Sequence, residues 1–386
     1  MRAPITRKGG GGSSFLSRGA PLLPNHPLGG TIYGTGLQPA SAANKGGYMA
    51  TANATSSSAG RLLGSLRLPI GIVAFLGISL TVLGIDQFVN ALTLGAIYAL
   101  VALGYTMVYG IIELINFAHG DVFMVGSFVA MFISSSLLGN EGAITNIPLL
   151  AGSVLVLFAL TIGVMAIVGA LIERLAYRPL RRAPRLAPLI TAIGVSFILQ
   201  NVIQFFFGPT IVTVPQLVPI EWSIQVSGAR VPLLNLFVIA ASVALMFALQ
   251  LFISRTRTGR AMRTTSMDRD ASSLMGVDIN RTIMITFLIG SGLAGAAGVV
   301  HGLYYGNTSF NLGFQSGLKA FTAAVLGGIG NTAGAALGGF LIAFIEVGAS
   351  AFGYGRWGGA VVFSLLVIFL VFRPTGLLGS HSGDRA

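Results

Sequence analysis

The sequence predicts an all-α polytopic integral membrane protein, with about 8 core transmembrane helices, one extra N-terminal helix and glycine-rich broken or re-entrant segments. Hydrophobic residues make up 54% of the 386 residues and charged residues only 9%, whereas soluble domains are about 25% charged. Several apolar runs reach the length of about 20 residues that crosses a bilayer as a helix. Because these runs are continuous rather than alternating, they exclude a membrane β-barrel.

The charge of the chain is strongly basic, with a formal net charge of +12. In a soluble protein this would suggest nucleic-acid binding. Here the arginines gather in short loops between apolar runs, as expected for loops on the cytoplasmic side of a membrane. We therefore expect no nucleic-acid partner. The chain has no cysteine and four scattered histidines, so we expect no disulfide, no metal site and no cofactor.

The N-terminal residues 1–67 differ from the rest of the chain. They are rich in Gly, Ser, Ala and Pro and hold seven basic residues but no acidic one. Such a segment cannot bury a core, so we expect a disordered basic tail. It would either touch anionic membrane lipid or be a tail without function, with the true start at Met49. Residues 68–87 are predicted as the extra N-terminal transmembrane helix, with a signal peptide as the alternative.

The loops between the predicted spans set the orientation. Loop 174–187 holds five arginines and no acidic residue, and loop 254–282 holds six arginines against three aspartates. Both are expected in the cytoplasm, with loops 139–148 and 208–230 on the outer side. The predicted spans are 68–85, 88–109, 119–138, 149–172, 188–207, 231–253, 283–304, 333–352 and 357–372.

Two segments dense in glycine or polar residues interrupt the apolar runs. Residues 110–120 contain Glu113, Asn116 and His119 beside apolar spans, and residues 327–334 read Gly-Gly-Ile-Gly-Asn-Thr-Ala-Gly. Dense glycine weakens a helix, and broken helices at membrane depth are tolerated where they line a cavity. One break in each half of a chain is typical of a transport pathway. Ordinary loops at helix ends are the alternative.

The acidic residues do not identify an energy source. Glu113, Asp121 and Glu173 fall at predicted span ends near the cytoplasmic interface, and Glu346 is the only carboxylate well inside a span. A single such group does not distinguish proton coupling from helix packing.

Known catalytic motifs do not point to an enzyme. The sequence lacks the phosphate-binding loop of an ATPase. The Gly-x-Gly-x-x-Gly pattern at 353–358 follows no strand, so it is not a dinucleotide site. No nucleophile–base or paired-acid arrangement appears. We expect no catalytic residue in this chain and place the energy source in another subunit.

The loop 266–277 predicts a short amphipathic helix. Acidic residues suit its N-terminus, apolar residues share one face and a glycine suits its end. A helix of this kind docks in the groove of a partner or lies on the membrane surface. The residues concerned are Asp268, Asp270, Ala271, Ser272, Leu274, Met275 and Gly276.

A resemblance to a known family becomes specific at this loop. Asp270-Ala-Ser-x-x-x-Gly276 resembles the Glu-Ala-Ala-x-x-x-Gly motif of ABC-importer permeases, with Asp for Glu and Ser for the second Ala. Four further segments resemble LivH-type branched-chain amino acid permeases: the opening helices, a basic loop, a glycine segment and a C-terminal motif. They are residues 90–121, 173–181, 320–330 and 373–379. The resemblance covers roughly 88–380, predicted as the permease domain.

The resemblance implies the permease subunit of an ATP-driven importer of leucine, isoleucine and valine in the bacterial inner membrane. The implied partners are a second, LivM-type permease, two cytoplasmic ABC ATPase subunits and a periplasmic or lipid-anchored substrate-binding protein. The 266–277 helix would seat on the ATPase. The candidate pathway residues are Asn90, Glu113, Asn116, His119, Gly327, Gly328 and Gly330.

Three alternatives remain open. The nearest is a permease of the same superfamily for urea, short-chain amides or other amino acids, although Phe117-Ala-His favours the branched-chain type. An ion-coupled secondary transporter would need Glu346 or His301 as an ion site inside the membrane. A non-transporting membrane subunit would bind an ATPase without supporting uptake.

Overall fold

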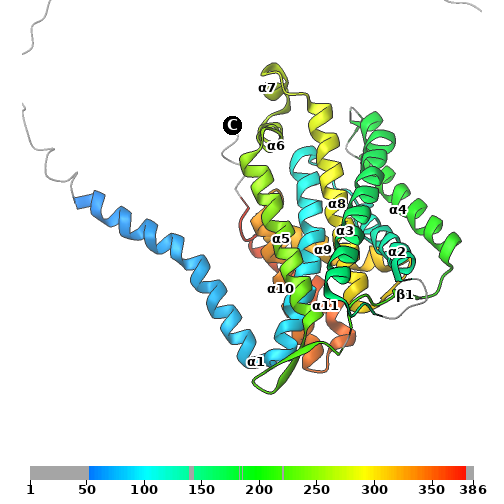
Figure 1. The fold of residues 1–386 in the computed structure, drawn as a ribbon. Coiled ribbons are helices and arrows are strands. Elements are labelled where there is room, and N and C mark those ends of the chain that lie inside the picture. Colours follow the sequence, from blue (N-terminus) through cyan, green and yellow to red (C-terminus); the bar gives the residue numbers. More distant parts are fainter. Residues whose placement is uncertain (1–51, 139–142, 182, 185, 220, 380–386) are drawn as a thin grey trace, which may run out of the picture. The chain divides into compact units, whose positions relative to one another are not determined.

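A computed structural model describes residues 52–138, 143–181, 183–184, 186–219 and 221–379 (Figure 1). The chain divides into two units, Met1–Arg67 and Leu68–Ala386. Up to residue 51, the predicted tail and Met49 lie outside the described residues, and residues 52–67 form the first turns of helix α1. The fold described below is that of the second unit.

Helices make up most of the residues that the structure describes, and α1 begins in the first unit and continues into the second. The helices are α1 (Ala52–Ile112), α2 (His119–Leu138), α3 (Ile147–Ile172), η1 (Glu173–Tyr177), η2 (Arg178–Leu180), α4 (Leu186–Phe207), α5 (Leu233–Arg255), α6 (Arg257–Met267), α7 (Arg269–Leu274), α8 (Ile279–Tyr305), α9 (Leu312–Gly327), α10 (Thr332–Ala351), η3 (Gly355–Trp357) and α11 (Gly358–Phe372). The strands form two antiparallel pairs, β1 (Val212–Thr213) with β4 (Asn307–Thr308) and β2 (Ser223–Val226) with β3 (Ala229–Pro232).

The polytopic membrane fold is confirmed. Among the described residues, eight helices are long and apolar enough to cross a membrane. The first runs from Pro69 to Ile112 and joins the predicted spans 68–85 and 88–109. It is interrupted at Gly84, whose φ of 75° lies outside the helical region. The other seven predicted spans each coincide with one helix to within a few residues.

Helix α9 (Leu312–Gly327) is an additional helix that the predicted spans did not include. Its 16 residues extend over about 24 Å, less than the bilayer core of about 30 Å. It also contains Lys319 and Gln315, which break the apolar pattern on which the predicted spans were based.

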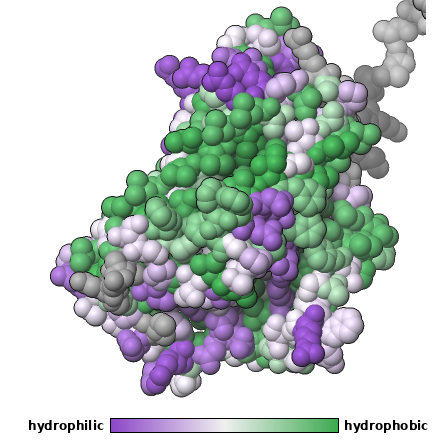
Figure 2. Space-filling view, turned by 90° about the vertical axis from the view of Figure 1, so that its right-hand side faces the viewer, coloured by the Kyte–Doolittle hydropathy of each residue, from purple (hydrophilic) through white to green (hydrophobic). Residues whose placement is uncertain are grey.

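The two ends of the helices differ in character (Figure 1). Helices α6 and α7 lie at one end. The two arginine-rich loops of the sequence, which contain η1, η2 and the α5–α8 connection, meet there, so we call it the arginine-rich end. The strands lie at the opposite end, which we call the strand end. Figure 2 shows a broad band of hydrophobic surface, with hydrophilic residues concentrated towards the two ends of the visible face. A band of this kind is typical of a surface that contacts lipid.

Helix α8 forms the centre of the core and packs against α2 and α3. Small residues allow the close approach: a Cβ on Gly126 of α2 would lie 2.8 Å from the Cα of Gly295 of α8. Small residues are characteristic of helix interfaces in membranes, where close backbone contact replaces the hydrophobic effect. The glycines of the span 283–304 are therefore packing residues.

Candidate functional site

The C-terminal half of α1 borders a cavity at the strand end. This cavity has a volume of about 520 Å³ and lies between α1, α5, α8 and the segment that contains the strands. Asn90 of α1 is one of its lining residues. The side-chain oxygen of Asn90 accepts hydrogen bonds from Asn235 Nδ2 at 3.2 Å and from the Tyr304 hydroxyl at 3.4 Å. Asn90 therefore links three helices at the strand end.

The same helix borders a second cavity at the arginine-rich end. Its volume is about 390 Å³, and α1 contributes Thr106, Met107, Gly110 and Ile111. The ends of α5 and α6, the turn between α9 and α10 and residues 378–379 complete the lining. Between the two cavities the α1 side chains are buried, as Ile97 with 1% exposure illustrates. Helix α1 thus borders two separate cavities, with a buried section between them.

The first interruption of the helices lies at residues 113–118, between α1 and α2. Glu113 ends α1 with a φ of 57°, a conformation that non-glycine residues seldom adopt, and its side chain is exposed rather than turned into the cavity. Asn116 is buried and its side-chain oxygen accepts from the Tyr177 hydroxyl at 2.9 Å and the Ala118 amide at 3.1 Å. Asn116 therefore satisfies backbone and side-chain donors at the break.

Helix α2 begins inside the membrane-spanning region rather than at its edge. The fully buried His119 ring occupies the space that a Cβ on Gly104 would fill. Gly104 lies more than two helical turns, about 12 Å, before the end of α1. The ring of His119 also packs edge-on against Tyr105, with centroids 4.7 Å apart. The segment between α1 and α2 therefore returns into the helix bundle, as a re-entrant segment does.

This geometry corrects the expected position of Asp121. We expected it at the cytoplasmic interface, but it lies in the first turn of α2 and is 1% exposed. Its carboxylate accepts hydrogen bonds from Ser196 and, at 2.9 Å, from Gln200 Nε2, both on α4. The expectation failed because it assumed that α2 starts where α1 ends. Asp121 is a buried polar link between α2 and α4.

The second interruption lies at residues 328–331, between α9 and α10. Gly328 and Gly330 have φ values of 104° and 91°, a region that suits glycine. The C-terminal motif packs on this turn: the Leu377 amide donates to the Leu326 carbonyl at 2.8 Å and the Leu378 amide to the Gly327 carbonyl at 3.0 Å. Two motifs far apart in the sequence thus form one local structure.

The two interruptions come together at the arginine-rich end. A Cβ on Gly110, at the end of α1, would lie 3.4 Å from the Cα of Gly330. Next to them, Asn116 and Ile329 line a void of only about 10 Å³. Of the predicted pathway residues, Asn90 lines the strand-end cavity and Gly330 the arginine-rich one. His119 is packed between helices, and the exposed Glu113 lines neither cavity.

The loop 266–277 forms helix α7 at the tip of the arginine-rich end (Figure 1). The Asp268 side chain caps it by accepting from the Ala271 amide at 2.9 Å, and Gly276 ends it with a φ of 84°. Ser272 is buried and its hydroxyl donates to the Asp268 carbonyl. Leu274 and Met275 are 89% and 84% exposed, and we call this pair the apolar tip. Asp270 and Ala271 are also exposed.

Arg269 connects this loop to helix α1. Its guanidinium donates a hydrogen bond of 2.8 Å to the carbonyl of Ile111, at the end of α1. The last carbonyls of a helix have no partner within the helix, and a cation there is favourable. The sequence analysis missed this contact, because nothing local relates Arg269 to residue 111. It joins α7 to the point where α1 ends and the re-entrant segment starts.

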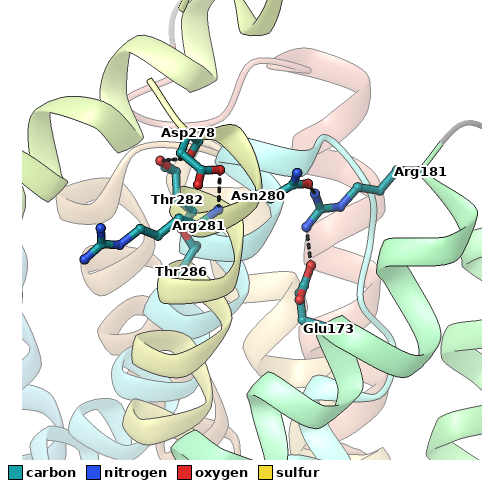
Figure 3. A network of polar contacts seen from close by, with 7 residues as sticks. All are labelled: Glu173, Arg181, Asp278, Asn280, Arg281, Thr282 and Thr286. Carbon is teal, nitrogen blue, oxygen red and sulfur yellow. Dashed lines mark hydrogen bonds and ion pairs between the residues drawn. The ribbon is translucent and has the colours of Figure 1, made fainter. Parts of the chain in front are cut away.

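A second polar network connects the start of loop 174–187 to the start of α8 (Figure 3). Arg181 forms an ion pair with Glu173 and donates a hydrogen bond to the Asn280 side chain. Burial lowers the pKa of the Arg181 guanidinium from its ordinary value, although Glu173 beside it acts in the opposite direction. Asp278 caps the same end of α8 by accepting from the Arg281 amide at 3.0 Å. The network fixes the start of α8 directly after the α7 loop.

A charged pair between α9 and α10 was also missed. Glu346 of α10 accepts from Lys319 Nζ of α9 at 2.5 Å and from the Tyr98 hydroxyl of α1 at 2.9 Å. The sequence contained a signal for it, because Lys319 is the only lysine after residue 45. A lone lysine among apolar residues, together with the one carboxylate inside a span, predicts an intramembrane pair.

Comparison with known proteins identifies the family. A family model described as branched-chain amino acid transport system / permease component matches residues 87–371. The chain is 45% identical over 305 residues to the high-affinity branched-chain amino acid transport system permease protein BraD of Pseudomonas aeruginosa, covering 78% of this chain and 97% of that protein. It is 41% identical over 304 residues to the corresponding permease protein LivH of Escherichia coli, again over 78% and 97%. No solved structure matches the chain significantly. The chain therefore belongs to the family of branched-chain amino acid transport system permease components.

Proposed function

We propose that this protein is the membrane-spanning permease subunit of an ATP-driven importer that carries leucine, isoleucine and valine across the bacterial inner membrane. The observation that carries the proposal is the 45% identity to a branched-chain amino acid permease over 97% of its length. The two cavities along α1, separated by a buried section, fit a protein that opens alternately to either side.

The orientation follows from charge. The arginine-rich end faces the cytoplasm under the positive-inside rule, so the strand end faces the periplasm. A substrate-binding protein then delivers the amino acid to the strand-end cavity. A second, LivM-type permease completes the pathway, and two ATPase subunits bind at the arginine-rich end. The apolar tip and the rest of the 266–277 loop are the proposed ATPase contact.

An ion-coupled mechanism is less well supported. It would use Glu346 as an ion ligand, but that carboxylate is already paired with Lys319 and Tyr98. An importer of this family receives its energy at the cytoplasmic end, where α7 projects (Figure 1).

ATP-dependent uptake of radiolabelled leucine tests the proposal. The chain is reconstituted in proteoliposomes with its neighbouring permease, ATPases and binding protein. We expect uptake that requires ATP and this chain, and no uptake when the chain is left out. Uptake of urea or another amino acid in place of leucine would show that the proposed substrate is wrong, while the proposed ATP-driven permease architecture would stand. Uptake that ignores ATP and follows an ion gradient would overturn the proposal as a whole.

Arg269 provides a second test, because it connects α7 to α1. Removing a hydrogen bond to a charged group costs about 1.5–3 kcal/mol. We expect Arg269→Ala to lower the leucine transported per ATP hydrolysed by about tenfold or more, while the complex still assembles. Arg260→Ala, at an exposed arginine of α6, is the matched control and should keep the wild-type ratio. An unchanged ratio in the Arg269 variant would show that this contact does not transmit the ATPase movement.

A further inference from the structure

Lys319, Glu346 and Tyr98 form a charged cluster between three helices. Lys319 Nζ lies 2.5 Å from Glu346 Oε1 and 3.3 Å from the Tyr98 hydroxyl, and that hydroxyl lies 2.9 Å from Glu346 Oε2. The Lys319 ammonium also lies 5.8 Å from the centre of the Tyr98 ring. Each polar group of the cluster thus has a hydrogen-bond partner, and the positive charge of Lys319 balances the negative charge of Glu346.

The position of the cluster is unusual for a structural ion pair. Charges inside a membrane are expensive, and replacing an internal ion pair by apolar residues is often neutral or stabilising. Helices α9 and α10 already approach closely without it, since a Cβ on Gly338 of α10 would lie 2.9 Å from the carbonyl carbon of Ala323 of α9. Packing alone therefore does not explain why this site holds charges.

The cluster is also partly accessible. The side chains of Lys319 and Glu346 are 20% and 19% exposed. Charges at membrane depth face a water-filled space or a protein surface rather than lipid. Tyr98 lies on α1 about 12 Å from Asn90 of the strand-end cavity and about 12 Å from Thr106 of the arginine-rich cavity. The cluster is therefore at the level of the buried section between the two cavities.

We propose that the Lys319–Glu346 pair receives the zwitterionic head group of an amino acid as it passes between the cavities. The substrate carboxylate takes the place of Glu346 at the Lys319 ammonium, and the substrate ammonium takes the place of Lys319 at the Glu346 carboxylate. Net charge stays at zero throughout, so no isolated charge is left in the membrane interior. Without substrate, the two side chains neutralise each other.

This inference rests on the proposed function and names the chemical feature of the substrate that the pathway recognises. The feature is the α-ammonium and α-carboxylate that leucine, isoleucine and valine share, independent of the side chain. An uncharged solute such as urea has no charges to exchange with the pair. A charged pair with this role is therefore expected in a permease for amino acids and not in a permease for urea.

The test uses the complete reconstituted complex and the double variant Lys319→Met, Glu346→Gln. We expect the complex to assemble and its ATPase to respond to leucine-loaded binding protein, while leucine uptake falls by about tenfold or more. The matched control is Asp86→Asn, Arg356→Gln, which also removes one charge of each sign from exposed residues. Wild-type uptake in the double variant would overturn the inference, because a structural pair tolerates neutralisation of both partners.

A second variant keeps the inference testable should the double variant not assemble. Lys319→Arg retains both charges, and a guanidinium binds a carboxylate more tightly through two parallel hydrogen bonds. We expect a melting temperature at or above that of the wild type together with uptake lowered by about tenfold, because the substrate must open a stronger internal pair. Unchanged uptake in this variant would contradict an exchange role. Absence of ATP-dependent uptake in the wild type would instead refute the proposed function.

Discussion

The double variant Leu274→Asp, Met275→Asp is expected to abolish leucine uptake while leaving the fold of the permease intact. Both side chains are more than four-fifths exposed, at 89% and 84%, so the substitutions remove little contact within this chain. Burying a leucine or methionine side chain contributes about 1.5–3 kcal/mol. Losing two such contacts and adding two charges should weaken ATPase binding by about a hundredfold or more.

Two measurements check this expectation. Co-purification of the ATPase subunits with the variant should decrease, and ATP-dependent leucine uptake in proteoliposomes should fall to background. Thr264→Asp in α6 is the control, since it adds a carboxylate at an exposed position of the same end outside the apolar tip. If the double variant keeps its ATPase and its uptake, the tip is a membrane-surface element and another part of the protein contacts the ATPase.

Gly376→Ala is expected to destabilise the protein strongly, although it adds a single methyl group. Gly376 has a φ of 82°, and a non-glycine residue held in such a conformation costs about 1–3 kcal/mol. Its Cβ would also lie 2.5 Å from the Cα and 2.6 Å from the amide nitrogen of Gly328. Neither is a flexible side-chain atom, so overpacking adds about 1–3 kcal/mol.

The measurement is the melting temperature of the detergent-solubilised protein. Two controls separate the causes of the effect. Gly208→Ala has a similar φ of 82° but nothing within 4 Å of its Cβ, so it reports backbone strain alone. Gly152→Ala, within α3 and also with nothing within 4 Å, should leave the melting temperature almost unchanged. If Gly376→Ala melts like Gly152→Ala, the C-terminal motif is not packed on the α9–α10 turn.

Most of the membrane spans were predictable because their cause is local. An apolar run of sufficient length forms a helix in lipid whatever its neighbours are. Helix α9 was missed because it has only 16 residues and contains polar ones. Lys319 interrupts its apolar pattern, and only the partner Glu346 in α10 makes a lysine acceptable at that depth. The sequence signals the pairing only indirectly, because Lys319 is the only lysine after residue 45 and Glu346 the only carboxylate well inside a predicted span.

The distinction between local causes and contacts with distant residues also applies to the candidate site. The position of α7 was predictable, since Asp268 as its cap and Gly276 at its end act on neighbouring backbone groups. The depth of Asp121 was not, because it depends on the return of residues 113–118 into the bundle. The contact of Arg269 with the Ile111 carbonyl spans 158 positions of sequence. Long-range contacts of this kind need the three-dimensional structure.

The link between Asp121 and α4 has a consequence for how the protein is made. Its partner Ser196 is synthesised 75 residues later, which takes about 4–15 s at translation rates of about 5–20 residues/s. During this interval the carboxylate of α2 has no partner on α4, and an unpaired carboxylate is unfavourable in the bilayer core. Helix α2 alone is therefore less favourable in lipid than α2 paired with α4. We expect this difference to favour joint entry of the two helices into the membrane.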